Sequence, residues 1–185
     1  MSRAPGTGPL PAIILLSGSG ANDRDETVCG HKPFRILASF FARHGYAVQR
    51  YDTRGSVGSS GNADRTTFSD SVADATAAFR ALALTTGIDQ NRICFCGHSE
   101  GGLVAATAAP NLPVHAVIML AGPAMPIELP LNGQARAISL EAAARGRQPR
   151  GLRPLSCPRR QGEWRVARPR RPHRRRAPRP HFISR

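Results

Sequence analysis

The sequence predicts an α/β fold, a doubly wound and mostly parallel sheet. Apolar runs of strand length alternate with amphipathic stretches, and glycine-rich turns follow these runs. The first run, at residues 12–16, is continuously apolar, which is typical of a strand covered on both faces. Alternation of strands and helices favours parallel pairing with helices on both sides of the sheet. In such sheets, functional residues gather at the carboxyl ends of the strands.

Apolar periodicity and helix-breaking residues place the individual elements. Pro33 suits the first turn of a helix, Thr67 can cap the start of another, and Gly87 and Pro110 end helices. We expect strands at 12–16, 46–51, 92–96 and 114–120, the last of them buried, and helices at 33–44, from 68 to Gly87, from 100 to Pro110 and over 129–145.

The net charge of +14 belongs to the end of the chain. Residues 1–144 hold 11 Lys+Arg and 11 Asp+Glu, whereas residues 145–185 hold 15 Lys+Arg against Glu163 alone. The first part is therefore neutral, which excludes a basic face of the kind that nucleic-acid-binding folds carry. From residue 146 the chain is rich in Arg, Pro and Gly without hydrophobic periodicity. We expect a domain at 1–145 and a disordered tail at 146–185.

Two interpretations of residues 146–185 remain. One is a basic arm that binds nucleic acid or another acidic surface, with the domain as a non-enzymatic anchor. The other is that the segment is translated out of frame, because a GC-rich gene read in the wrong frame yields a composition rich in Arg, Pro, Gly and Ala. Arginine also far outnumbers lysine there. We favour the second interpretation.

The four cysteines form neither a disulfide framework nor a metal-binding pattern. Cys94 and Cys96 alternate along one predicted strand and are expected to be small core residues. The acidic residues at 23–26 lack the spacing of a calcium loop and are expected to pair with Arg24 or Lys32. We expect no metal and no cofactor. No apolar stretch reaches the roughly 18–20 residues that cross a bilayer, so we expect a soluble protein, cytoplasmic by default.

The most informative motif is Gly97-His98-Ser99-Glu100-Gly101, between an apolar run and a stretch of small residues. Strand, sharp turn and helix in this order are the setting of a serine nucleophile on a strained turn. The Glu100 N–H at the helix start can bind a developing oxyanion. The second oxyanion donor is expected in the loop after the first strand, as the Ser19 N–H, with Gly20 as the alternative.

Several sequence phrases occur in a fixed order along the chain. They are Ser17-Gly18-Ser19-Gly20 with Asp23-Arg24-Asp25-Glu26, Gly30-His31-Lys32-Pro33-Phe34, Tyr51-Asp52-Thr53-Arg54-Gly55, the Ser99 motif with Gly102, and Leu120-Ala121-Gly122-Pro123. Together they resemble the α/β-hydrolase superfamily, in particular bacterial esterases and serine-aminopeptidase-like proteins related to dienelactone hydrolases. The resemblance covers residues 12 to about 144 and implies hydrolysis of a small carboxylic ester through an acyl-enzyme at Ser99. It does not separate esterase from aminopeptidase chemistry.

The resemblance also implies a catalytic acid and a catalytic histidine on later strands, and neither is found. No aspartate follows Ser99, and the histidines after it are His115, in a predicted buried strand, and His173 and His181 in the tail. Glu128 follows a strand, but without a histidine to orient we expect it to be a surface residue.

Histidines before or beside the nucleophile do not replace the missing base in our interpretation. His98 is adjacent to Ser99 on a sharp turn, where neighbouring side chains point apart, and is expected to pack in the turn. His31 and His44 are expected on the surface or in structural roles. We therefore expect a partial α/β-hydrolase fold with strongly reduced turnover, because loss of a triad member costs several powers of ten in rate. An unpaired sheet edge should also promote aggregation.

Overall fold

The computed structural model describes residues 8–123, 133, 136–137 and 139–140. Strands and α-helices alternate along this part of the chain, as the sequence predicts. The predicted tail at 146–185 and Glu128 lie outside the described residues, as does much of the predicted helix at 129–145. The elements are β1 (Leu10–Leu16), α1 (Pro33–Arg43), β2 (Ala47–Gln49), α2 (Phe68–Ala83), β3 (Ile88–His98), α3 (Glu100–Ala108) and β4 (Ala116–Leu120), with 3-10 turns at Ala63–Arg65 and Ala109–Asn111.

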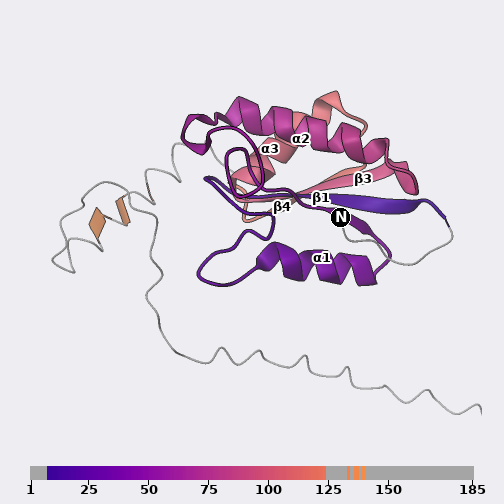
Figure 1. The fold of residues 1–185 in the computed structure, drawn as a ribbon, viewed down its shortest axis with the longest axis horizontal. Coiled ribbons are helices and arrows are strands. Elements are labelled where there is room, and N and C mark those ends of the chain that lie inside the picture. The colour runs from indigo at the N-terminus through magenta and orange to yellow at the C-terminus, as the bar shows by residue number, and fades with distance from the viewer. Residues whose placement is uncertain (1–7, 124–132, 134–135, 138, 141–185) are drawn as a thin grey trace, which may run out of the picture. The chain divides into compact units, whose positions relative to one another are not determined.

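The sheet is parallel and has the strand order β2-β1-β3-β4. From β1 the chain winds through α1 to β2 on one side, and then returns through α2 to β3 on the other side of β1. Figure 1 shows α1 on one face of the sheet and α2 and α3 on the opposite face. The winding direction therefore reverses between β1 and β3. Such a switch point opens a crevice at the carboxyl ends of the strands, where ligands bind in folds of this class.

The core lies in two layers, one on each face of β1. Every residue of β1 except Pro11 is buried, which confirms that both faces of this strand are covered. Burying a large aliphatic or aromatic side chain contributes about 1.5–3 kcal/mol, so these layers fix where β1 and β3 end. The larger layer packs against α2 and α3 and contains Ile14, Leu16, Phe79, Leu82, Ile93, Phe95 and Val104; the smaller packs against α1 and contains Ile13, Leu15, Phe34, Ala38, Val48 and Cys96.

Helix α2 begins where the sequence predicts. The Thr67 hydroxyl accepts a hydrogen bond from the Asp70 N–H at 3.2 Å, and the Asp70 carboxylate accepts one from the Thr67 N–H at 2.9 Å. This reciprocal capping box satisfies donors that the first helical turn leaves unpaired. Thr67 is thus confirmed as the N-cap.

The prediction that 114–120 is a buried strand is wrong. β4 spans Ala116–Leu120, and its first four residues are exposed, as is His115 just before it. Within the described part of the chain, β4 pairs with β3 alone and ends the sheet. Its apolar side chains, including Ile118 at 38% exposure, therefore lack the cover that a continuous apolar run suggested. The predicted unpaired edge is present among these residues.

Candidate active site

The Ser99 turn has the strained backbone of a nucleophile elbow. Ser99 lies between the last residue of β3 and the first residue of α3, with φ 53° and ψ −120°. A positive φ is unfavourable for a residue with a side chain and costs on the order of 1–3 kcal/mol. The backbone is held by two hydrogen bonds, from the Ser99 N–H to the Leu120 carbonyl at 2.9 Å and from the Gly102 N–H to the Ser99 carbonyl at 3.0 Å. The Ser99 side chain does not cap α3, which leaves its hydroxyl uncommitted among the described residues.

Glycine is required on both sides of Ser99 because backbones approach closely there. A Cβ on Gly97 would lie 2.1 Å from the Gly101 carbonyl oxygen, and one on Gly101 would lie 2.2 Å from the Leu16 carbonyl oxygen. Neither contact is possible for real atoms. The two glycines therefore let the first turn of α3 rest directly on β1 and β3, which confirms the space that the motif predicts.

The loop after β1 lies against the elbow. A Cβ placed on Gly18 would lie 3.3 Å from the Cβ of Ser99. Ser19 follows on this loop, and Glu100 follows Ser99, so the two predicted oxyanion donors come from neighbouring segments. Both residues line one cavity of about 120 Å³ beside the sheet, although Ser99 itself is not part of its wall. Among the described residues, neither the Ser19 N–H nor the Glu100 N–H donates to a protein acceptor.

Asn22 sets the direction of the Ser19 N–H. Its side-chain amide donates to the carbonyls of Gly18 at 2.9 Å, Ser19 at 3.1 Å and Gly20 at 3.3 Å. The Gly18 carbonyl and the Ser19 N–H belong to one planar trans peptide and point in opposite directions. Because the carbonyl faces Asn22, the Ser19 N–H faces away from it. Asn22 was not singled out by the sequence, although an asparagine just after a glycine-rich turn is typical of such local bonding.

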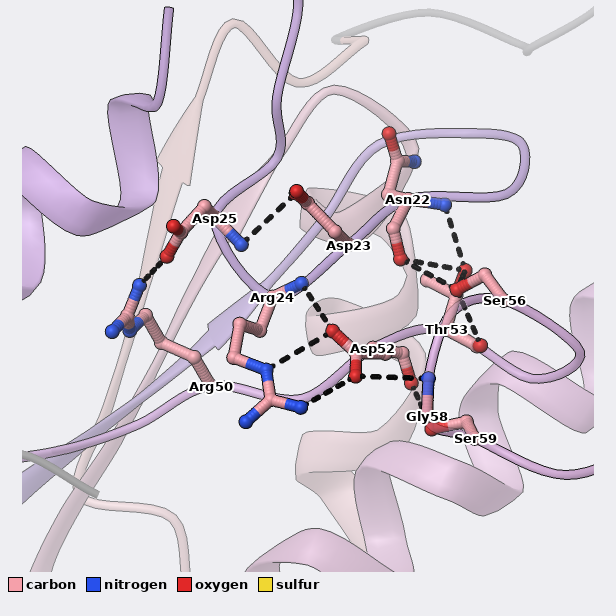
Figure 2. Close-up of polar contacts among 10 residues, drawn as sticks. All are labelled: Asn22, Asp23, Arg24, Asp25, Arg50, Asp52, Thr53, Ser56, Gly58 and Ser59. Carbon is pink, nitrogen blue, oxygen red and sulfur yellow. Dashed lines mark hydrogen bonds and ion pairs between the residues drawn. The ribbon is translucent and has the colours of Figure 1, made fainter.

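The loop after β2 anchors the loop after β1 (Figure 2). The Asn22 N–H donates to the Thr53 hydroxyl at 2.8 Å, and the Asn22 carbonyl accepts from the Thr53 N–H at 2.9 Å and the Ser56 hydroxyl at 2.8 Å. Arg24 forms a two-pronged ion pair with the buried Asp52, with N–O distances of 3.1 and 2.7 Å. The hydrogen bond from this guanidinium lowers the pKa of Asp52 to about 2.

The acidic segment at 23–26 pairs only partly as predicted. Asp25 contacts Lys32 at 3.4 Å, as expected, and also forms an ion pair with Arg50. Arg24 pairs with Asp52 rather than with a carboxylate of its own segment. No cluster of His, Cys, Asp and Glu with metal-binding geometry occurs among the described residues.

His98 contacts a carboxylate and not the Ser99 hydroxyl. Its Nδ1 lies 2.8 Å from Oε1 of Glu26, and its side chain is 43% exposed. It does not reach the Ser99 hydroxyl by a hydrogen bond, in agreement with the expectation that the two side chains point apart. Of the other described histidines, His44 stacks on Phe40, and neither His31 nor His115 has a hydrogen bond to Ser99. Among the described residues, no imidazole is therefore hydrogen-bonded to the Ser99 hydroxyl.

The predicted core cysteines are confirmed for one residue and in part for the other. Cys96 is buried, and burial raises the pKa of its thiol to about 11. Cys94 is half-buried in the same layer. No helix in the described part of the chain is long and apolar enough to span a membrane.

A parallel sheet with a serine on a strained strand-to-helix turn, faced by a glycine-rich loop from the neighbouring strand, defines an α/β-hydrolase fold. Within that superfamily the chain belongs to the family described as serine aminopeptidase, S33, whose model matches residues 32–180. The matched range therefore includes residues 146–180, which belong to the predicted tail.

Individual relatives point the same way. Esterase EstD of Thermotoga maritima is 33% identical over 129 residues, which cover 70% of this chain and 31% of EstD. The chain therefore spans about a third of that curated relative. The esterase Pf2001 of Pyrococcus furiosus is 25% identical with a TM-score of 0.56, covering 72% of this chain and 49% of that one. The α/β hydrolase GrgF from Penicillium sp. sh18, at 20% identity, TM-score 0.55 and coverage of 80% and 50%, supports the fold alone.

Proposed function

We propose that this chain carries the nucleophile half of a carboxylic-ester hydrolase, with Ser99 as the nucleophile. The observation that carries the proposal is the backbone of Ser99, at φ 53° between β3 and α3 with its hydroxyl uncommitted among the described residues. A strained residue at the carboxyl edge of a parallel sheet is typical of a catalytic position. The family of the chain, and the esterases among its relatives, support the same chemistry.

The reaction proceeds by acyl transfer. The Ser99 oxygen adds to the ester carbonyl while its proton passes to solvent, and the carbonyl oxygen becomes an oxyanion that the Ser19 and Glu100 N–H groups bind. The positive end of the α3 dipole adds to this stabilisation. Collapse of the intermediate expels the alcohol, which takes up a proton, and leaves an acyl-serine that water hydrolyses to the carboxylic acid.

Turnover by this chain is slow in the proposed mechanism, because no described histidine is placed to take the proton of Ser99. An oxyanion hole and substrate binding alone retain about 10³–10⁴-fold acceleration over water when triad members are removed. The substrate is a small ester whose acyl or alcohol group enters the cavity of about 120 Å³ beside Ser19 and Glu100. The size of that cavity favours a short chain.

A fluorophosphonate probe tests this proposal, because it reacts covalently with a serine on a formed elbow. With excess probe and long incubation we expect stoichiometric but slow labelling of Ser99, located by peptide mass spectrometry, because no described histidine takes the serine proton. For the same reason, p-nitrophenol should be released only slowly from p-nitrophenyl acetate. Ser99→Ala should abolish labelling, while Ser69→Ala, at an exposed serine of α2, should not change it. Absence of label in the wild type, or equal labelling of the Ser99→Ala variant, would refute the proposal.

The concentration of charge in residues 145–185 favours a second candidate function, binding of nucleic acid by a basic tail. Fifteen arginines against Glu163 would neutralise phosphates, so the affinity for a duplex should fall steeply with salt. Titration of labelled DNA and RNA with the full chain and with a chain ending at residue 145 tests this. Binding that survives the deletion would exclude the tail as the binding element.

A further inference from the structure

Glu26 connects the loop after β1, which carries Gly18 and Ser19, to the turn around Ser99 through a single oxygen atom. Its Oε1 accepts a hydrogen bond from the Gly18 N–H at 2.7 Å and contacts Nδ1 of His98 at 2.8 Å. The residue is only 3% exposed, so this carboxylate is removed from water. A buried carboxylate is tolerated where such charge-assisted hydrogen bonds replace its hydration.

The backbone around Glu26 is strained and firmly held. Glu26 has φ 51°, in the left-handed region that favours glycine. Its N–H donates to the Asp23 carbonyl at 2.9 Å, and the Asp23 carboxylate accepts from the N–H groups of Asp25 at 3.1 Å and Thr27 at 2.9 Å. Strain of this kind persists only where surrounding contacts over-determine it, and it clusters at functional sites. The turn therefore presents the Glu26 side chain to Gly18 in one orientation.

We propose that Glu26 is a positioning residue for catalysis, which fixes the Ser19 N–H in the oxyanion hole and ties that loop to the residue before the nucleophile. This inference rests on the proposed function of Ser99 and Ser19. Two successive peptides flank Gly18. Glu26 holds the N–H of the first, and Asn22 holds the carbonyl of the second at 2.9 Å. With both peptides fixed, the N–H of the second peptide, which is that of Ser19, has one direction.

The space around Gly18 supports this role. A Cβ there would lie 3.3 Å from Oε1 of Glu26, 3.3 Å from the Cβ of Ser99 and 3.6 Å from Nδ1 of His98. The carboxylate, the imidazole and the nucleophile thus surround one glycine. The Glu26–His98 contact joins the segment before α1 to the end of β3, 72 residues apart. A carboxylate oxygen only accepts hydrogen bonds, so this contact requires a proton on Nδ1 of His98.

The test uses the full chain and the rate of Ser99 labelling by a fluorophosphonate. Glu26→Leu keeps the volume but removes the acceptor, and we expect labelling at least about 30-fold slower, since loss of one oxyanion donor costs about 10²–10³-fold. Glu26→Gln retains an oxygen for both donors and should label within about threefold of the wild type. Asp25→Leu is the matched control, because Asp25 pairs with Lys32 and Arg50 and has no hydrogen bond to Gly18; its rate should stay within about twofold.

A second readout separates positioning from general stability. Hydrogen exchange of the Gly18 amide and the ¹⁵N shifts of the His98 ring are measured in the wild type, in Glu26→Gln and, where it folds, in Glu26→Leu. We expect a protected Gly18 amide and a proton on Nδ1 in the wild type. If Glu26→Leu does not fold, these values and the Glu26→Gln rate decide the question.

Equal labelling rates in wild type and a folded Glu26→Leu variant would overturn the role of Glu26. A loss of more than 30-fold in Glu26→Gln would overturn it as well, because the charge would then matter rather than the placed acceptor. Failure of the wild type to label refutes the proposed function instead. In that case an unprotected Gly18 amide overturns the positioning role, and a protected amide that becomes exposed in Glu26→Leu supports it.

Discussion

Two adjacent glycines of α3 provide a sharp test of how the elbow is built. Gly101→Ala would place a Cβ 2.2 Å from the Leu16 carbonyl oxygen and 2.6 Å from that of Ser17, both of them backbone atoms. Gly102→Ala would place a Cβ 3.1 Å from the terminal methyl of Met119, the end of a flexible side chain. The same chemical change is therefore blocked by rigid backbone at one position and opposed by a movable group at the next.

The magnitude follows from how far α3 would have to move. Relief of the Gly101 contact needs a retreat of about 1 Å, which forfeits a quarter to a half of the dispersion energy of each affected contact. The helix buries Val104, Ala105 and Ala108 against the sheet, so these contacts weaken together. Overpacking costs about 1–3 kcal/mol or more, and alanine regains up to about 1 kcal/mol of helix propensity. We expect Gly101→Ala to lose about 2 kcal/mol of stability and Gly102→Ala to stay within about 1 kcal/mol of the wild type.

Urea unfolding at low protein concentration, followed by far-ultraviolet circular dichroism, measures both free energies. Gly8→Ala is the control, because no heavy atom lies within 4 Å of its Cβ position. Fluorophosphonate labelling should also be lost in Gly101→Ala and retained in Gly102→Ala. Two alanine variants of equal stability, within about 0.5 kcal/mol, would refute the close approach of α3 to β1.

Three further predictions concern the loops and the sheet edge. The pKa of Asp52 is about 2 in the folded chain and about 3.9 when unfolded, so its contribution to stability is complete above about pH 4 and is lost as the pH falls toward 2. Urea midpoints of the wild type should thus fall more steeply over that range than those of Asp52→Asn, and parallel curves would contradict this. Asn22→Ala should slow Ser99 labelling about tenfold or more by releasing the Gly18 carbonyl, and an unchanged rate would contradict the orienting role of that amide. Ile118→Lys should reduce aggregation, measured by light scattering, because a charge on an edge strand opposes pairing between chains; a wild-type chain that is monodisperse and melts cooperatively would contradict the premise.

The elements of the fold were predictable because their signals are local. The continuous run that became β1, the Thr67 cap and the glycines around Ser99 each act through neighbours in sequence. The burial of β4 was not predictable in the same way, since an apolar run indicates only that other segments can pack over the strand. Whether it is covered depends on segments elsewhere in the chain, and the described residues leave Ile118 exposed.

The same distinction between local signals and contacts with distant segments applies to the candidate site. Ser99 was predicted as the nucleophile because strand, turn and helix are adjacent in sequence, and Ser19 as an oxyanion donor because it lies in the loop after the first strand. Glu26 was expected to pair with Arg24 or Lys32, since the sequence does not reveal that folding brings it to Gly18 and, across 72 residues, to His98. Long-range polar contacts of this kind leave no periodic signal.

The arrangement of the loops implies that oxyanion binding and proton transfer are separable in this protein. Asn22 and Glu26 hold the two peptides that flank Gly18 and so orient the Ser19 N–H, the first proposed donor, and the loop that carries Asn22 is anchored in turn by Thr53, all within the described part of the chain. None of these contacts requires a histidine partner for Ser99. The oxyanion hole should therefore be formed even where the general base is absent. A short alkylboronic acid forms a tetrahedral adduct with Ser99, whose proton passes to solvent, and places a boronate oxygen in the oxyanion hole. It should bind with an affinity that Asn22→Ala weakens, while ester turnover stays slow in both proteins.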